Sequence, residues 1–99
     1  LWDIGNSDAD CGDDFDKFYQ PFKPYIRHVH VKDLLRVNQA QVLMGEGDLP
    51  VAGIARCLRD DGFDGYVSLE WEKKWHPELA DPEVAFPQYI SYIREALEK

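Results

Sequence analysis

The sequence has no run of about 18 consecutive apolar residues, so no segment of it is expected to span a membrane. It also lacks a charged segment followed by an apolar one, the usual mark of a secreted protein. Basic residues are scarce, since 11 Lys and Arg stand against 19 Asp and Glu and leave a net charge of −8. No basic patch interrupts this excess of acid. We therefore expect a cytoplasmic protein that binds neither nucleic acid nor membranes.

Cysteine is nearly absent. Cys11 and Cys57 lack CxxC spacing, which favours reduced structural thiols over the alternatives of a disulfide or a metal site. What the chain does contain is globular in composition, with 44% apolar and 13% aromatic residues. Its 99 residues are enough for one domain or part of one. Because Leu1–Gly5 reads as a strand entered partway along, we expect a fragment of a larger domain.

The segment from 26 to 32 has the clearest strand pattern. Successive side chains of a strand point to opposite faces. One face would carry Ile26, His28, His30 and Lys32, and the other would carry Val29 and Val31. The sequence therefore predicts a strand that packs through its valines and presents polar groups on its opposite face.

Strand and helix patterns alternate along the rest of the chain. Strands are expected over 1–5, 26–32 and 66–72, helices over 15–22, 50–59 and from 82 onward, and loops over 6–14, 33–47 and 73–80. The last helix has an apolar stripe of Phe86, Tyr89, Ile90, Ile93 and Leu97. This alternation predicts an α/β fold whose strands are parallel and joined by helical crossovers.

Three residues with metal-binding side chains lie toward the C-terminal ends of the three expected strands: Asp3, His30 and Glu70. In parallel α/β folds, ligands and catalytic groups gather at those ends. Two carboxylates and an imidazole suit Mn²⁺, Mg²⁺, Zn²⁺ or Co²⁺. The alternative is that His28 and His30 are hydrogen-bonded groups of the core.

Other residues are candidates for binding a substrate. Lys32 could hold a hydroxyl, carboxylate or phosphate, or else form a salt bridge to a neighbouring acid. Glu72, Trp75 and His76 follow the last strand, where an aromatic ring could cover a sugar. Asp33 is expected to be a solvent-exposed or structural residue.

Four short motifs follow one another in a characteristic order: Asp3-Ile4-Gly5-Asn6, His28-Val29-His30-Val31-Lys32-Asp33, Gly45-Glu46-Gly47-Asp48-Leu49-Pro50 and Ser68-Leu69-Glu70. Together they resemble the C-terminal part of the xylose isomerase-like TIM barrels of the sugar phosphate isomerase/epimerase family. The resemblance implies a partial TIM barrel of about three β/α units with parallel strands. Residues 1–99 would be the C-terminal segment of a (β/α)8 barrel domain whose N-terminal part is absent.

The resemblance also implies roles for single residues. Asp3, His30 and Glu70 would bind a divalent metal ion, Mn²⁺ first and Mg²⁺, Co²⁺ or Zn²⁺ as alternatives, with one further Glu from an earlier strand. Glu70 would also be a catalytic acid and base. Arg36, six residues after the metal-binding His, and Asn6, which stands where the epimerases have a His, would contact substrate. The strand pattern adds Lys32 and His28 to the expected substrate-binding residues.

The implied activity is a metal-dependent isomerisation or epimerisation of a sugar or sugar derivative by proton transfer next to a carbonyl. A dehydratase or lyase of the same barrel family is the alternative, as is an inactive structural fragment. A related DNA-repair endonuclease is disfavoured by the charge of −8. Because three strands cannot close a barrel, we expect the chain alone to be inactive. Its exposed edges would be covered by the missing barrel portion or by other copies of the chain.

Overall fold

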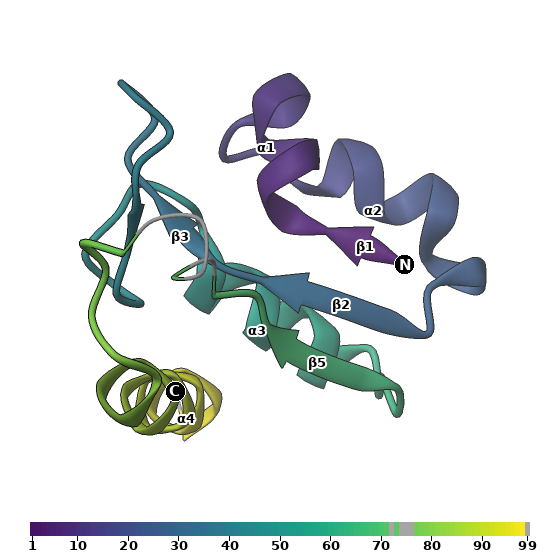
Figure 1. The fold of residues 1–99 in the computed structure, drawn as a ribbon. Helices are drawn as coiled ribbons and strands as arrows, with labels where there is room; N and C mark the ends of the chain where they lie inside the picture. Colours follow the sequence, from purple (N-terminus) through teal and green to yellow (C-terminus); the bar gives the residue numbers. More distant parts are fainter. Residues whose placement is uncertain (72, 74–76, 99) are drawn as a thin grey trace.

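The computed structural model describes residues 1–71, 73 and 77–98, and a parallel sheet lies at its centre (Figure 1). The strands of this sheet are β1 (Trp2–Asp3), β2 (His28–Val31) and β5 (Tyr66–Leu69), in the order β1-β2-β5. The register pairs Asp3 with His30 and His30 with Ser68. The predicted α/β class with parallel strands is confirmed, and the arrangement is that of a partial TIM barrel.

The helices are α1 (Ile4–Cys11), α2 (Asp16–Phe22), α3 (Val51–Asp60) and α4 (Pro82–Glu98), with a 3-10 turn η1 (Lys23–Tyr25) after α2. Figure 1 shows α1 and α2 beside β1, with α3 behind β2 and β5. Arg56 of α3 donates a hydrogen bond to the carbonyl of Ala96, which ties α3 to α4. Among the described residues, no helix has the length and apolar character needed to cross a membrane.

The alternation predicted for β2 is confirmed, because Val29 and Val31 are 0% and 3% exposed while His28 and His30 are half-buried. Ile26 is an exception, since it joins the core instead of the histidine face. It precedes the strand as the residue that ends η1, so the alternation does not yet apply to it. The core comprises Trp2, Ile4, Tyr19, Ile26, Val29, Val31, Leu34, Met44, Leu49, Val51, Ile54 and Leu58.

The prediction of a loop over 6–14 is wrong for most of its length, because α1 begins at Ile4 and continues to Cys11. Asp3 caps this helix by accepting hydrogen bonds from the backbone N–H groups of Gly5 and Asn6 at 3.0 and 3.3 Å. Only Ile4 and Ser7 of α1 are buried. A helix that buries so few side chains leaves almost no apolar stripe in its sequence.

The stretch 33–47 is not a plain loop, since β3 (Asp33–Leu34) and β4 (Gln41–Val42) form a short antiparallel pair within it. Asp33, 1% exposed, accepts hydrogen bonds from four backbone N–H groups, those of Leu34, Gly45, Gly47 and Leu49. Of the two expectations for Asp33, solvent exposure or a structural role, the structure shows the structural role. Cys11 and Cys57 are free thiols in this structure.

The apolar stripe predicted for the last helix is only partly correct. Tyr89 and Ile93 pack against the core, but Phe86 and Ile90 are 42% and 46% exposed. The fully buried residues of the helix are two small ones, Ala85 and Ala96. The packed face therefore combines these alanines with Tyr89, Tyr92 and Ile93 and leaves out Phe86 and Ile90.

A hydrogen bond links α2 to the end of α3, and we expect its contribution to stability to depend on pH. The buried Tyr19 hydroxyl donates to Asp61 at 2.6 Å, and this bond, together with Lys23, lowers the pKa of Asp61. We expect Tyr19→Phe to lower the midpoint of thermal unfolding by about 5 °C at pH 7. Because the folded-state pKa of Asp61 is lowered, the difference should shrink as the pH falls below about 4.

Calorimetric scans of both proteins from pH 7 down to pH 3 check this expectation. A difference between the two proteins that stays constant across that range would show that Asp61 is not the acceptor that matters.

Candidate metal centre

The three predicted ligands meet at one edge of the sheet. Asp3 ends β1, His30 lies in β2, and Glu70 directly follows β5, where its backbone N–H bonds to the carbonyl of Val31. One potential ligand atom from each side chain lies within 4.8 Å of the others. The in-register pairing of parallel strands causes this convergence, because it aligns the three strand ends.

The chemistry of this group fits a divalent cation. Two ligands of one ion lie about 3–4.5 Å apart when each is about 2.0–2.3 Å from it. The observed separations therefore require only small side-chain adjustments. Carboxylate oxygen and imidazole nitrogen together suit Mn²⁺, Mg²⁺, Zn²⁺ or Co²⁺. Asp3, His30 and Glu70 are each half-buried, so an ion could reach them from solvent.

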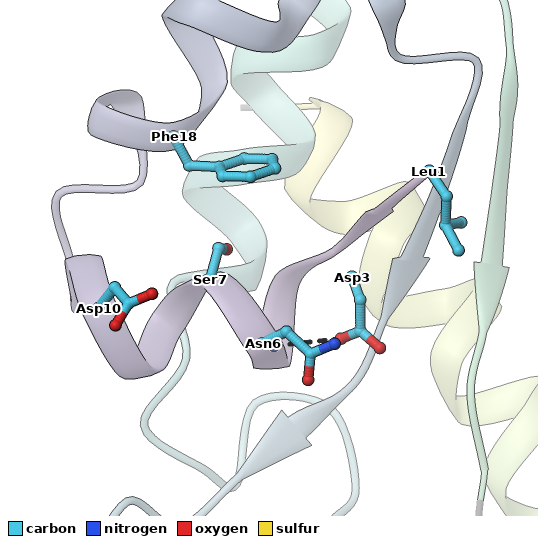
Figure 2. Close-up of a pocket in the computed structure, with 6 residues that line it drawn as sticks. All are labelled: Leu1, Asp3, Asn6, Ser7, Asp10 and Phe18. Atoms are coloured by element: carbon cyan, nitrogen blue, oxygen red, sulfur yellow. Dashed lines mark hydrogen bonds between the residues drawn. The ribbon is translucent and has the colours of Figure 1, made fainter.

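The cap of α1 fixes the orientation of Asp3. Its Oδ1 accepts the N–H groups of Gly5 and Asn6, and Figure 2 shows the bond from Asn6. A carboxylate has about four lone-pair positions, so the capping bonds leave others for a cation. The same side chain thus starts a helix and contributes to the candidate site.

Glu70 is held by two neighbours. Lys32 Nζ lies 2.6 Å from its Oε1, and His30 Nδ1 lies 3.3 Å from its Oε2. The Lys32 ammonium, more than any other neighbour, lowers the pKa of Glu70, against the opposing effect of burial. Lys32 Nζ also lies 3.7 Å from Asp3 Oδ1. The salt bridge considered as one role for Lys32 is therefore present in this structure, and its role in substrate binding remains a prediction.

His28 lies on the same face of β2 as His30 but outside the group of three. Its Nε2 is 2.8 Å from the hydroxyl of Ser68, and its ring meets the His30 ring edge-on at a centroid distance of 4.6 Å. This contact supports the orientation of the His30 ring. Both histidines are thus hydrogen-bonded and half-buried, and the predicted role of His28 in substrate binding remains a prediction.

Asn6 borders a cleft of about 350 Å³ next to Asp3 (Figure 2). The cleft is lined by Leu1, Asp3, Asn6, Ser7, Asp10 and Phe18. Ser7 accepts a hydrogen bond from the Trp2 indole and donates one to the carbonyl of Ile4, whereas Asn6 is exposed. Asn6 is thus placed to meet a polar molecule that approaches Asp3.

Arg36 binds two acidic side chains. It donates two hydrogen bonds to Asp8, at 3.0 and 2.8 Å, and one to Asp13, at 2.9 Å. These bonds raise the pKa of the guanidinium and connect the loop after β3 to α1 and to the turn that follows it. The predicted role of Arg36 in substrate binding remains a prediction.

Replacing Arg36 with alanine separates a structural role from a substrate contact. Exposed ion pairs contribute about 0.2–1 kcal/mol each, so we expect the midpoint of thermal unfolding to fall by about 3 °C. Metal affinity should be unchanged, because Arg36 does not belong to the group around Glu70. Calorimetry and metal titration measure the two quantities. An unchanged midpoint with a raised KM would instead favour direct contact with substrate.

Two residues that contribute to the site were not predicted from the sequence. The Gln41 side chain of β4 donates a hydrogen bond to the backbone carbonyl of Glu70. Gly5 leaves the space in which Lys32 lies, since a Cβ at Gly5 would be 2.3 Å from Lys32 Cε. The glycine in Asp3-Ile4-Gly5-Asn6 could have indicated a close approach by another side chain. Nothing in the sequence indicated the pairing of β3 and β4 that places Gln41. Glu72, Trp75 and His76 lie outside the described residues.

The model of a family described as "Xylose isomerase-like TIM barrel" matches residues 1–96, nearly the whole chain. No curated protein and no solved structure matches the chain. The family covers sugar isomerases and epimerases.

Proposed function

Since this chain belongs to the xylose isomerase-like TIM barrel family, we propose that it carries part of the active site of a divalent-metal-dependent isomerase or epimerase. The substrate is a sugar or sugar derivative, and the reaction moves a proton at the carbon next to a carbonyl. The observation that supports this most directly is the convergence of Asp3, His30 and Glu70 from three separate strands.

Asp3, His30 and Glu70 would hold the cation, with Mn²⁺ as the first candidate. When bound, such an ion polarises the substrate carbonyl and stabilises negative charge that develops on its oxygen. The chain's own contribution is the placement of its ligands. The helix cap orients Asp3, and the contact between His28 and His30 supports the imidazole.

Glu70 would accept the proton from the carbon beside the carbonyl. Its carboxylate is ionised at neutral pH, and the Lys32 ammonium, which lowers its pKa, reduces its basicity while it stays in contact. Return of the proton to the opposite face needs a second acid. We place that group, together with the fourth metal ligand, in another part of a longer protein or in a second copy of the chain.

Asn6 and Lys32 would position the substrate. Asn6 borders the cleft beside Asp3 and can exchange hydrogen bonds with a sugar hydroxyl. The Lys32 ammonium lies between the two acids and can donate to a substrate oxygen near them.

Titration of the metal-free, full-length protein with Mn²⁺ tests the site. Asp3→Ala, His30→Ala and Glu70→Ala should each weaken binding by at least about tenfold, and Asp64→Ala, in an exposed turn, should not. Unchanged affinity in all three site variants would remove the proposed centre.

Incubation with sugars in D₂O tests the reaction. An isomerase or epimerase should release products of unchanged composition that carry deuterium at the carbon next to the carbonyl. A product that has lost water would identify a dehydratase instead. A protein that binds metal at this site but exchanges no proton on any ketose, aldose or their phosphates would contradict the proposed activity.

A further inference from the structure

Lys32 occupies the position where a positive charge is needed between the candidate ligands. Its Nζ is 2.6 Å from Glu70 and 3.7 Å from Asp3. Its side chain is 12% exposed, less than that of Asp3 at 17% and those of Glu70 and His30 at 30%. Lys32 is therefore the most enclosed of these four groups.

The first turn of α1 provides the space for this lysine. A Cβ on Gly5 would lie 2.3 Å from Lys32 Cε and 3.3 Å from both Lys32 Nζ and Asp3 Oδ1, so its severe overlap is with the lysine. The backbone N–H of Gly5 donates to the same Asp3 oxygen that faces the ammonium. Any side chain at position 5 would therefore force the Lys32 side chain out of its present place between the two acids.

Two carboxylates that converge without a cation repel each other and favour the protonated state. A lysine ammonium between them removes that repulsion. A divalent ion that binds the same oxygens must approach this fixed positive charge, or displace it.

We infer that Lys32 is an internal competitor of the metal ion. Its ammonium holds Asp3 and Glu70 together when no metal is bound, and it gives way at Glu70 when one binds, so that Lys32 and Gly5 set the metal affinity of the site. This inference rests on the proposed metal centre. It assigns Lys32 a positioning role that is distinct from contact with substrate.

Mn²⁺ titration of the full-length protein at constant pH and ionic strength tests the competition. Lys32→Met should tighten binding by about tenfold or more, because it removes the charge but keeps most of the side-chain volume. Gly5→Ala should tighten binding in the same direction but less, because it displaces the ammonium without removing it. The control is Lys17→Met, which changes the net charge equally at a lysine that is 71% exposed and paired with Asp14.

Thermal unfolding supplies a second measurement. Without metal, Lys32→Met should unfold at a lower temperature than the wild type, and saturating Mn²⁺ should close the gap. Equal or weaker Mn²⁺ binding by Lys32→Met, or tightening by Lys17→Met to the same extent, would overturn the inference. If Lys32→Met does not fold, Gly5→Ala decides, and unchanged affinity in that variant overturns the inference.

The proposed function can fail separately from this inference. If Asp3→Ala, His30→Ala and Glu70→Ala all leave Mn²⁺ affinity unchanged, the metal centre itself is wrong. If Asp3→Ala abolishes binding while Lys32→Met leaves the affinity at the wild-type value, the centre stands and only the competition is wrong.

Discussion

Replacing Glu70 with glutamine is expected to lower turnover at least about 1,000-fold, the largest effect on activity of any single change in this chain. Glutamine keeps the shape of the side chain but cannot accept a proton from carbon at neutral pH. It also loses the charge that binds Lys32 and that a divalent ion requires. We therefore expect Mn²⁺ affinity to fall as well, by about ten- to a hundredfold.

Two measurements separate these effects. Solvent deuterium exchange at saturating Mn²⁺ reports proton transfer alone, and metal titration reports binding. Glu98→Gln is the matched control, since Glu98 is an exposed residue at the end of α4. Exchange within tenfold of the wild-type rate at saturating metal would exclude Glu70 as the base.

Replacing Asp33 with alanine is expected to have the largest effect on stability, a loss of at least about 3 kcal/mol of unfolding free energy. Each carboxylate oxygen accepts two backbone N–H groups, Oδ1 those of Leu34 and Leu49 and Oδ2 those of Gly45 and Gly47. Burial raises the pKa of Asp33 while these four bonds oppose the rise. Alanine would leave four N–H donors without their acceptor.

Gly47 shows how closely the loop packs on this carboxylate, since a Cβ there would lie 2.4 Å from Asp33 Oδ1. Asp33→Asn separates the effect of side-chain volume from that of hydrogen bonding. It keeps the volume but replaces one acceptor oxygen with an NH₂ group, which would face two backbone N–H donors. We expect Asp33→Asn to destabilise the protein by a comparable amount. Urea unfolding compares both variants with Asp64→Ala, which should stay within about 0.5 kcal/mol of the wild type. A similarly small change in Asp33→Ala would contradict this role.

The sequence was sufficient to predict the elements that the sheet organises. Alternation in β2 placed His30 and Lys32 opposite the valines, and the order of strands and helices predicted parallel pairing. Together these predicted that Asp3, His30 and Glu70 would come together, and they do. The period-two pattern of β2 is reliable because its valine face is buried, whereas β5 shows no such alternation of burial.

The sequence was insufficient where structure depends on contacts between distant segments. The helix α1 is held by the cap at Asp3 and by Ser7 beneath the Trp2 indole, and neither leaves a periodic signal. Strands of two residues, such as β3 and β4, are too short for any period to show. The packed stripe of α4 was only partly predicted because two small residues, Ala85 and Ala96, are its most buried positions, while Phe86 and Ile90 are exposed.

The double use of Asp3 limits how the site can be redesigned. Asp3 both caps α1 and contributes to the candidate centre. A softer metal prefers histidine or cysteine, but either residue at position 3 would lose the hydrogen bonds that cap the helix. Asparagine, serine or threonine would preserve the cap while weakening the binding of the cation. Engineering toward another metal would therefore have to begin at His30 or Glu70, whose side chains start no helix.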